Sequence, residues 1–232
     1  MGDVQQLYDQ VDTDQDLYGD WQREDSLRAR PLFTVLWLIT LAVIGIMVLR
    51  MTPNGLDGKK YISARLTTKR SWTYGKIEMR AKLPAGRGTW PAFWMLPAAR
   101  TSDNLLDGEI DIMEYVGCEP GIVWFSLHNK KDRTDEGKNL LTTSLKVESP
   151  ETEWHTYGVE WTAEYIQAYV DGIPYYTFRN DGSSDPQSWP FDKPFNIKLN
   201  VAVGGSWGGY MGVDDSIFPA EYIIDYVRVY QR

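Results

Sequence analysis

Residues 108–117 read Gly-Glu-Ile-Asp-Ile-Met-Glu-Tyr-Val-Gly, with three carboxylic acids set among apolar side chains. The alternation predicts a β-strand, in which successive side chains point to opposite faces, so Glu109 and Asp111 share one face. In a regular strand Glu114 would fall on the other face. One extra residue near 112–113, a β-bulge, would return it to the face of the other two acids. The stretch therefore predicts a bulged strand with three carboxyls along one wall of a cleft.

Carboxyl groups crowded in this way cannot all ionise cheaply. Repulsion between like charges raises the pKa of at least one of them, so a protonated acid stands beside an ionised carboxylate near neutral pH. Retaining glycosidases need such a pair. Two other interpretations stay open. Clustered carboxylates also bind calcium, although the Asp- and Asn-rich loop of an EF-hand is absent, and a solvated edge strand can carry acids without any chemical role.

The neighbouring sequence resembles glycoside hydrolase family 16, in its bulged, laminarinase-like form. Besides Glu-Ile-Asp-Ile-Met-Glu, the matching stretches are Tyr-Gly-Lys-Ile-Glu-Met-Arg-Ala-Lys-Leu-Pro (74–84), Trp-Pro-Ala-Phe-Trp (90–94), Trp-His-Thr-Tyr-Gly-Val-Glu-Trp-Thr (154–162), Trp-Pro-Phe-Asp-Lys-Pro-Phe (189–195), Leu-Asn-Val-Ala-Val-Gly-Gly-Ser-Trp (199–207) and Ile-Asp-Tyr-Val-Arg-Val-Tyr (224–230). The resemblance runs from about Tyr61 to Gln231. It implies an all-β fold, a concanavalin-like β-jelly-roll of two packed sheets, whose concave face binds a β-glucan.

The resemblance also implies a role for each acid. Glu109 would be the nucleophile and Glu114 the general acid/base, with Asp111 between them, hydrogen-bonded to the nucleophile. The implied reaction is endo-acting, two-step hydrolysis of β-1,3-glucan (laminarin-like or mixed β-1,3/1,4) with retained configuration and no catalytic cofactor. A transglycosylase, a non-catalytic β-glucan-binding protein and a truncated inactive relic stay open as alternatives.

Further side chains are expected to contact the sugar because they match family positions. They are Arg65, Trp90, Trp94, His128, Asn200 and Trp207. Each has a structural alternative, which is core packing for the tryptophans and a surface or hydrogen-bonded role for the others. Asp225 is the candidate metal ligand, for a structural calcium away from the cleft. Alternation would place it on one strand face with Ile223, Val227 and Val229, where a buried aspartate needs a partner, so a hydrogen-bonded aspartate is the equal alternative.

Composition narrows the class of ligand. The net charge of −8 disfavours nucleic acid, whose phosphates attract clusters of Lys and Arg, and it also disfavours polyanionic glycans. The chain has 14 Tyr and 10 Trp, which suits a carbohydrate cleft because sugar rings stack on indoles through their C–H faces. Cys118 is the single cysteine and can form no internal disulfide.

Four segments are expected along the chain. Residues 1–31 are polar and acidic, and we expect them to be disordered or loosely helical. Residues 32–50 are predicted to form a transmembrane helix, because 32–49 carry no charge and as a helix would be about 27 Å long, close to the thickness of a bilayer's hydrocarbon core. Residues 51–60 read as a linker and 61–232 as the glycoside hydrolase β-sandwich. The expected location is membrane-anchored, with this domain extracellular or periplasmic, where polymeric β-glucan is found.

The β-signals after Tyr61 are local and clear. Charged and apolar side chains alternate over 76–83, which predicts a half-buried strand, and Asp171-Gly172 between two strand-like runs predicts a hairpin. Members of the family usually have several strands upstream of the region that begins at Tyr61, and none is evident in the sequence. The predicted jelly-roll therefore lacks its first strands and follows one transmembrane helix.

Overall fold

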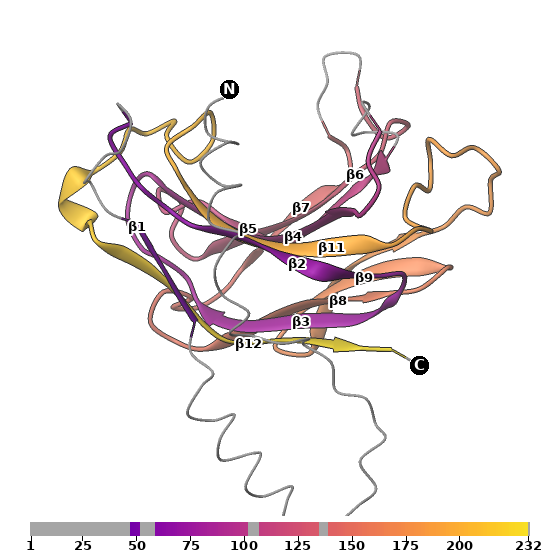
Figure 1. Ribbon diagram of the computed structural model, residues 1–232, viewed down its shortest axis with the longest axis horizontal. Coiled ribbons are helices and arrows are strands. Elements are labelled where there is room, and N and C mark those ends of the chain that lie inside the picture. Colours follow the sequence, from indigo (N-terminus) through magenta and orange to yellow (C-terminus); the bar gives the residue numbers. More distant parts are fainter. Residues whose placement is uncertain (1–46, 52–58, 102–106, 135–138, 232) are drawn as a thin grey trace, which may run out of the picture.

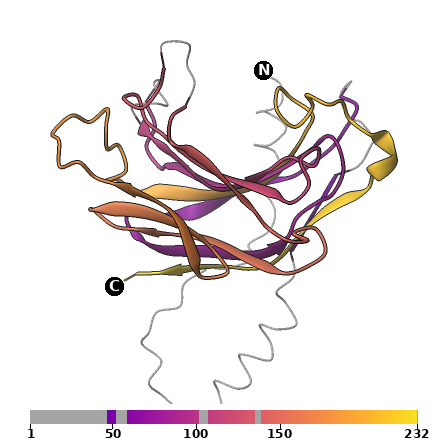
Figure 2. The same cartoon turned by 180° about the vertical axis from the view of Figure 1, so that it is seen from behind.

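The computed structural model describes residues 47–51, 59–101, 107–134 and 139–231. Within these ranges the chain forms two antiparallel sheets of six strands each, which stack as two layers (Figure 1). The view from behind shows the same two layers, with loops rising from the ends of the upper one (Figure 2). The expected all-β sandwich is confirmed.

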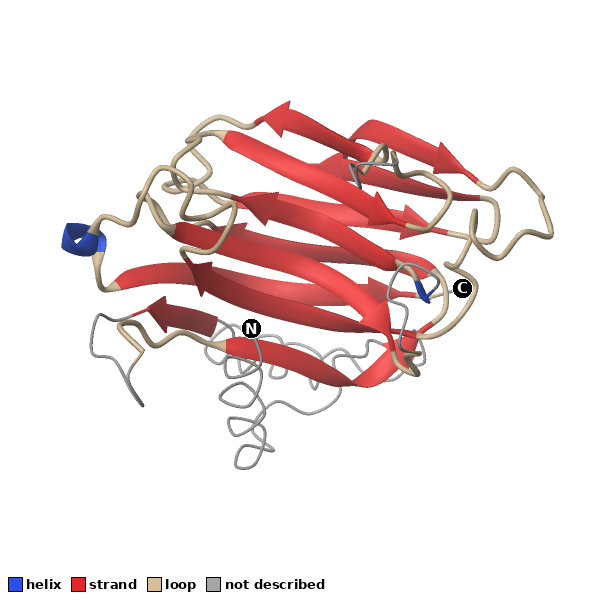
Figure 3. Cartoon of the chain, turned by 90° about the horizontal axis from the view of Figure 1, so that it is seen from above, coloured by secondary structure: helices blue, strands red, loops and turns tan. Residues whose placement is uncertain are grey.

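One layer, here called the back sheet, has the strand order β1-β12-β3-β8-β9-β10. Its strands are β1 (Met47–Met51), β12 (Ala220–Tyr230), β3 (Gly75–Lys82), β8 (His155–Trp161), β9 (Tyr165–Val170) and β10 (Ile173–Arg179). The other layer, here called the cleft sheet, has the order β2-β11-β4-β5-β6-β7. Its strands are β2 (Arg65–Trp72), β11 (Phe195–Val203), β4 (Thr89–Pro97), β5 (Glu109–Tyr115), β6 (Ile122–His128) and β7 (Thr142–Lys146). A single turn of 3₁₀ helix, η2 (Asp215–Ile217), precedes β12 (Figure 3).

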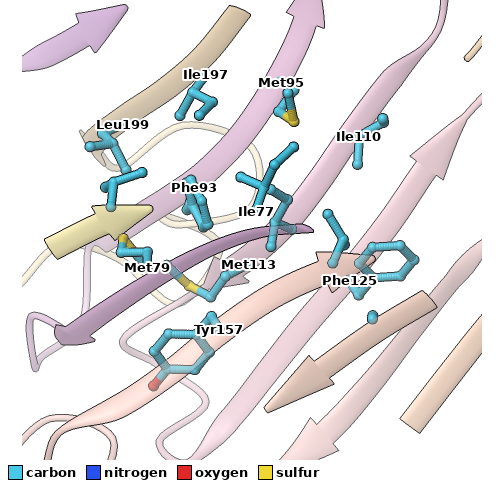
Figure 4. Packing of buried hydrophobic residues seen from close by; sticks show 14 of the residues in the cluster. Ile77, Met79, Phe93, Met95, Ile110, Met113, Phe125, Tyr157, Ile197 and Leu199 are labelled. Atoms are coloured by element: carbon cyan, nitrogen blue, oxygen red, sulfur yellow. The ribbon is translucent and has the colours of Figure 1, made fainter. Parts of the chain in front are cut away.

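The core lies between the two sheets, where their inward-facing side chains meet (Figure 4). On β11 the alternation is regular, with Ile197 and Leu199 buried while Lys198 and Asn200 lie on the opposite, cleft face. Because the period of a strand is two, burying one face of β11 fixes which polar side chains reach the cleft.

Both local β-predictions are confirmed. The alternating segment forms β3, with Ile77, Met79 and Ala81 fully buried. The hairpin joins β9 to β10, and its turn residues have positive φ, 52° at Asp171 and 77° at Gly172. Two successive residues of positive φ give the turn that matches the right-handed twist of paired strands.

The predicted N-terminal boundaries are partly wrong. Met47–Met51 forms β1 and pairs antiparallel with β12, from Met47 opposite Ile224 to Met51 opposite Ala220, so the last residues of the predicted 32–50 helix belong to the back sheet. The sandwich thus begins before residue 61 and has at least one strand upstream of the region where the resemblance begins. Residues 1–46 and 52–58 lie outside the described part. Most of the predicted helix and linker falls within these two ranges. No helix among the described residues is long and apolar enough to cross a membrane.

Candidate active site

The strand that carries the three acids lies inside the cleft sheet. β5 pairs with β4 on one side and with β6 on the other, so it is not an edge strand. The interpretation of these acids as a solvated edge is therefore wrong. Asp111 is buried, and Glu109 and Glu114 are only partly exposed.

The predicted β-bulge is present. Against β4 the register passes from Met113 opposite Phe93 to Asp111 opposite Trp94, which leaves Ile112 as the extra residue. Against β6, Asp111 lies opposite Ser126 and Glu114 opposite Trp124, again with one extra residue on β5. Ile110 and Met113 both point into the core, although three positions separate them (Figure 4). The bulge therefore returns Glu114 to the face of Glu109 and Asp111.

These acids line a cleft of about 510 Å³ on the outer face of the cleft sheet. Its walls are formed by Trp90, Glu109, Asp111, Glu114, Glu119, Trp124, Ser126, His128, Thr142 and Trp207. Two hydrogen bonds fix the row of acids. His128 Nε2 lies 2.7 Å from Asp111 Oδ2, and Trp90 Nε1 donates to Glu114 Oε1 at 3.1 Å.

Burial is the main reason that the acids of this row hold their protons. It raises the pKa of Glu109 to about 8, with a further increase from the charge of Asp111, while His128 opposes both effects. It also raises the pKa of Glu114 to about 7, against the hydrogen bond from Trp90. The pKa of Asp111 is raised by burial and by Glu114, and is lowered by its hydrogen bond with Glu109. The order of these values does not assign the roles, because neighbouring carboxyls titrate as a unit. Near neutral pH the row combines ionised and protonated carboxyls.

The predicted residues on the β4 and β11 side form a second group. Trp94 Nε1 donates to Asn200 Oδ1 at 2.7 Å, and the Arg65 guanidinium lies over the Trp94 ring at 5.2 Å from its centroid. Trp94 is opposite Asp111 across the β4–β5 pair, so this group borders the acids directly. It does not line the cleft around Glu114.

The wall on the β6 side contains residues that the sequence reasoning missed. Trp124 and Ser126 line the cleft, and both share a strand face with the predicted His128. The alternation Trp124-Ser126-His128 was a usable signal, since accepting His128 at the site places the residues two and four before it on the same face. Glu119 and Thr142 reach the cleft from a turn and from β7, and local sequence gives no comparable signal for them.

Asp225 lies elsewhere than expected. The register of β12 against β3 passes from Ile224 opposite Ala81 to Tyr226 opposite Arg80, so Asp225 is a bulged residue. It therefore does not share the buried face of Val227, and Arg80 Nη1 donates to its Oδ2 at 2.5 Å. This ion pair is the hydrogen-bonded alternative. A structural calcium at Asp225 stays a prediction, and Asp225 does not belong to the group of three possible metal ligands found among the described residues.

One group in the described part of the chain could hold a metal ion. Glu109, Asp111 and His128 offer ligand atoms that all lie within 4.8 Å of one another. Glu109 and Asp111 belong to the acid row itself. The hydrogen bond between His128 and Asp111 already occupies two of these three possible metal ligands. A carboxylate row of this kind, in a cleft of a jelly-roll sandwich walled by tryptophan, supplies the groups that a two-carboxylate glycoside hydrolase requires.

Comparison with known proteins places the chain in a family. Residues 45–228 match the model of glycosyl hydrolases family 16, so the chain belongs to that family, as its motifs indicated. It is 46% identical over 200 residues to the β-glucanase of Rhodothermus marinus, covering 81% of this chain and 68% of the relative. It is 38% identical over 169 residues to the glucan endo-1,3-β-glucosidase of Cryptopygus antarcticus, covering 68% of this chain and 61% of the relative.

The fold agrees with a solved structure. The laminarinase from Rhodothermus marinus superposes with a TM-score of 0.75 at 44% identity, covering 80% of this chain and 77% of that chain. The match to the family model begins at residue 45, just before β1. This agrees with the finding that the sandwich starts before Tyr61.

Proposed function

We propose that this chain is an endo-acting, retaining β-1,3-glucanase that cleaves laminarin-like or mixed-linkage β-1,3/1,4-glucan. The observation that carries the proposal is the bulge in β5, because it brings Glu109, Asp111 and Glu114 to one face of a cleft walled by tryptophan. The names of the relatives, a β-glucanase, a glucan endo-1,3-β-glucosidase and a laminarinase, support β-1,3-glucan as the substrate.

In the first step the Glu109 carboxylate attacks the anomeric carbon of the bound glycan. The bond from that carbon to the glycosidic oxygen breaks, and the Glu114 carboxyl gives its proton to this oxygen. Burial raises the pKa of Glu109 to about 8 and that of Glu114 to about 7, so the coupled row keeps a proton near neutral pH, and the proposed mechanism places this proton on Glu114. The product of the step is a glycosyl ester on Glu109 and a released sugar chain.

In the second step water replaces the released chain. The Glu114 carboxylate takes a proton from the water, the water oxygen attacks the anomeric carbon, and Glu109 leaves as a carboxylate. Two inversions at one carbon give retained configuration. Asp111 positions Glu109 through the hydrogen bond between their carboxyls, and His128 holds Asp111 from the other side.

The predicted membrane anchor and location are carried forward as proposals. Because Met47–Met51 pairs with β12, an anchor has to end before residue 47. A helix over 32–46 would be about 22 Å long, shorter than a typical hydrocarbon core. Flotation of the full chain with lipid vesicles tests the anchor, and recovery of all the protein in the vesicle-free fraction would contradict it.

The experiment that tests the activity is release of reducing ends from laminarin by the full chain purified in detergent. Glu109→Gln and Glu114→Gln should each abolish most of the release, while Glu153→Gln, an exposed carboxylate in the turn before β8, should leave it unchanged. Release that persists in Glu109→Gln would contradict the assignment. Products longer than the starting oligosaccharide would indicate a transglycosylase, and laminarin binding without release would indicate a binding protein.

A further inference from the structure

The wall beyond Glu114 is a corner built from β6, the turn that follows β5, and the loop over residues 204–212. Trp124 Nε1 donates to Glu119 Oε2 at 3.3 Å, and Tyr210 O–H donates to Glu119 Oε1 at 2.9 Å. The hydrogen bond to Glu119 raises the pKa of Tyr210 to about 12. Glu119 thereby ties the strand residue Trp124 to the loop residue Tyr210.

The indole rings in this corner continue toward the acid row. Trp207 packs edge-on against Trp124 at a centroid distance of 5.6 Å and against Trp90 at 5.5 Å. Trp90 is the residue whose N–H holds Glu114. The loop that carries Trp207 comes close to Trp90, since a Cβ at Gly208 would lie 2.8 Å from Trp90 Cβ. The corner is therefore a fixed extension of the cleft.

The position of the corner identifies the part of the substrate that reaches it. The anomeric carbon under attack lies between Glu109 and Glu114, with the ring that becomes attached to the enzyme nearer Glu109. The departing ring is joined to the oxygen that Glu114 protonates, so it lies on the Glu114 side. Trp124 is directly opposite Glu114 in the sheet, and Glu119 follows the same end of β5.

We propose that Trp124, Glu119 and Trp207 form a binding subsite for the departing sugar, a neutral hexopyranose, next to the acid/base. The inference rests on the proposed function and adds the part of the substrate that this corner recognises. The indole of Trp124 offers an apolar surface to the C–H face of the ring. Each Glu119 oxygen accepts one hydrogen bond in the free protein and keeps a second lone pair for a sugar hydroxyl.

The test separates substrates by the size of their leaving group. Laminarin must place a sugar in the proposed subsite, whereas β-laminaribiosyl fluoride releases only fluoride and leaves the subsite empty. Removing the Trp124 ring in Trp124→Ala should lower kcat/KM on laminarin by about tenfold or more, the loss expected for one aromatic contact. Fluoride release by the same variant should stay within about twofold of the parent, because the chemistry at Glu109 is untouched.

Two further variants keep the test decisive. Glu119→Gln preserves shape and removes the charged acceptor, so it should raise KM on laminarin by about threefold, roughly the value of one weak hydrogen bond, with fluoride release unchanged. Trp124→Phe should restore part of the laminarin activity, because it keeps an aromatic face. Trp154→Ala is the matched control, since Trp154 lies outside the cleft beneath Arg80 and Lys82.

The outcomes distinguish this inference from the proposed function. A parent chain that turns over neither substrate contradicts the β-1,3-glucanase assignment. A second outcome is that the parent turns over both substrates while each variant, Trp124→Ala and Glu119→Gln, loses as much activity on the fluoride as on laminarin. That result overturns the subsite and leaves the enzyme assignment intact. Unchanged laminarin kinetics in both variants overturns it as well.

Discussion

His128 lies opposite Glu109 in the β5–β6 pair, yet its imidazole bonds the next acid along the strand, with Nε2 2.7 Å from Asp111 Oδ2. The carboxyls of Asp111 and Glu109 are hydrogen-bonded in turn. A chain of three groups therefore leads from the imidazole to the proposed nucleophile. This chain fixes the orientation of Glu109, and His128 lowers the pKa of both Glu109 and Glu114.

Replacing His128 by Gln should move the pH dependence of activity upward. His128 lowers the pKa of both Glu109 and Glu114, so its removal raises both values and shifts both limbs of the kcat/KM profile on laminarin toward higher pH. We also expect kcat/KM at its optimum to fall about tenfold, roughly the contribution of one hydrogen bond to a charged group.

His155→Gln is the matched control, because the chain has two histidines and His155 bonds Asp171 at the end of β9. Its pH profile should match that of the parent. The kcat/KM profile of His128→Gln could instead keep both apparent pKa values of the parent and show only a lower kcat/KM at its optimum. That result would mean that His128 orients Asp111 without affecting the charge of the row.

The raised pKa values also predict how stability depends on pH. Glu109 and Glu114 titrate near 4.5 in the unfolded chain but at about 8 and about 7 in the folded one. Between these values the folded state binds more protons, so the free energy of unfolding is highest below pH 4.5 for these groups and falls as pH rises toward 8. Thermal melts of the parent and of Glu109→Gln across pH 5–8 measure this.

The Gln side chain does not titrate, so the variant should lose part of this slope. It should also be more stable than the parent at pH 8, where the parent must bury an extra charge. Parallel curves for the two proteins would mean that Glu109 sheds no proton in this range.

The acid row could be predicted from sequence because its signal is local. Alternation puts Glu109 and Asp111 on one face, and Glu114 reaches that face only with a bulge between them. The sequence gives no comparable signal for the bulge at Asp225 in β12. The residues on both sides of Asp225 are apolar whichever face they take, and no set of chemical groups has to be brought to one face. Regular alternation therefore assigned Asp225 to the wrong face.

The strand β1 was missed for a different physical reason. A continuous apolar run is compatible with a buried strand and with a membrane helix, and periodicity alone does not separate them. The deciding contact is the pairing of Met47–Met51 with β12, which lies more than a hundred residues away in the sequence. Glu119 was missed for the same reason, since Trp124 and Tyr210 become its partners only in the folded chain.

Replacing Asn200 by Leu should destabilise the folded chain and weaken substrate binding, because it removes the hydrogen bond that holds Trp94 beside the acid row. Asn200 Oδ1 accepts the Trp94 N–H at 2.7 Å, and a leucine leaves that partly buried donor without its partner. We expect a loss of about 1–2 kcal/mol in the free energy of unfolding, measured by urea denaturation, and a raised KM for laminarin. Asn200→Asp keeps an acceptor and is the control. Equal effects of the two substitutions would show that the Trp94 hydrogen bond is not the cause.

Azide distinguishes the nucleophile from the acid/base, which the pKa values leave open. In Glu114→Ala, β-laminaribiosyl fluoride can still form the glycosyl ester on Glu109, since fluoride leaves without a proton. The ester then accumulates for want of a base, and azide attacks the anomeric carbon, releasing Glu109 and giving the β-azide. In Glu109→Ala, azide enters the vacated space and displaces fluoride directly, with a single inversion, giving the α-azide.

Without azide we expect each variant to be at least about a hundredfold slower than the parent. NMR of the anomeric proton identifies the product. An α-azide from Glu114→Ala together with a β-azide from Glu109→Ala would exchange the two roles.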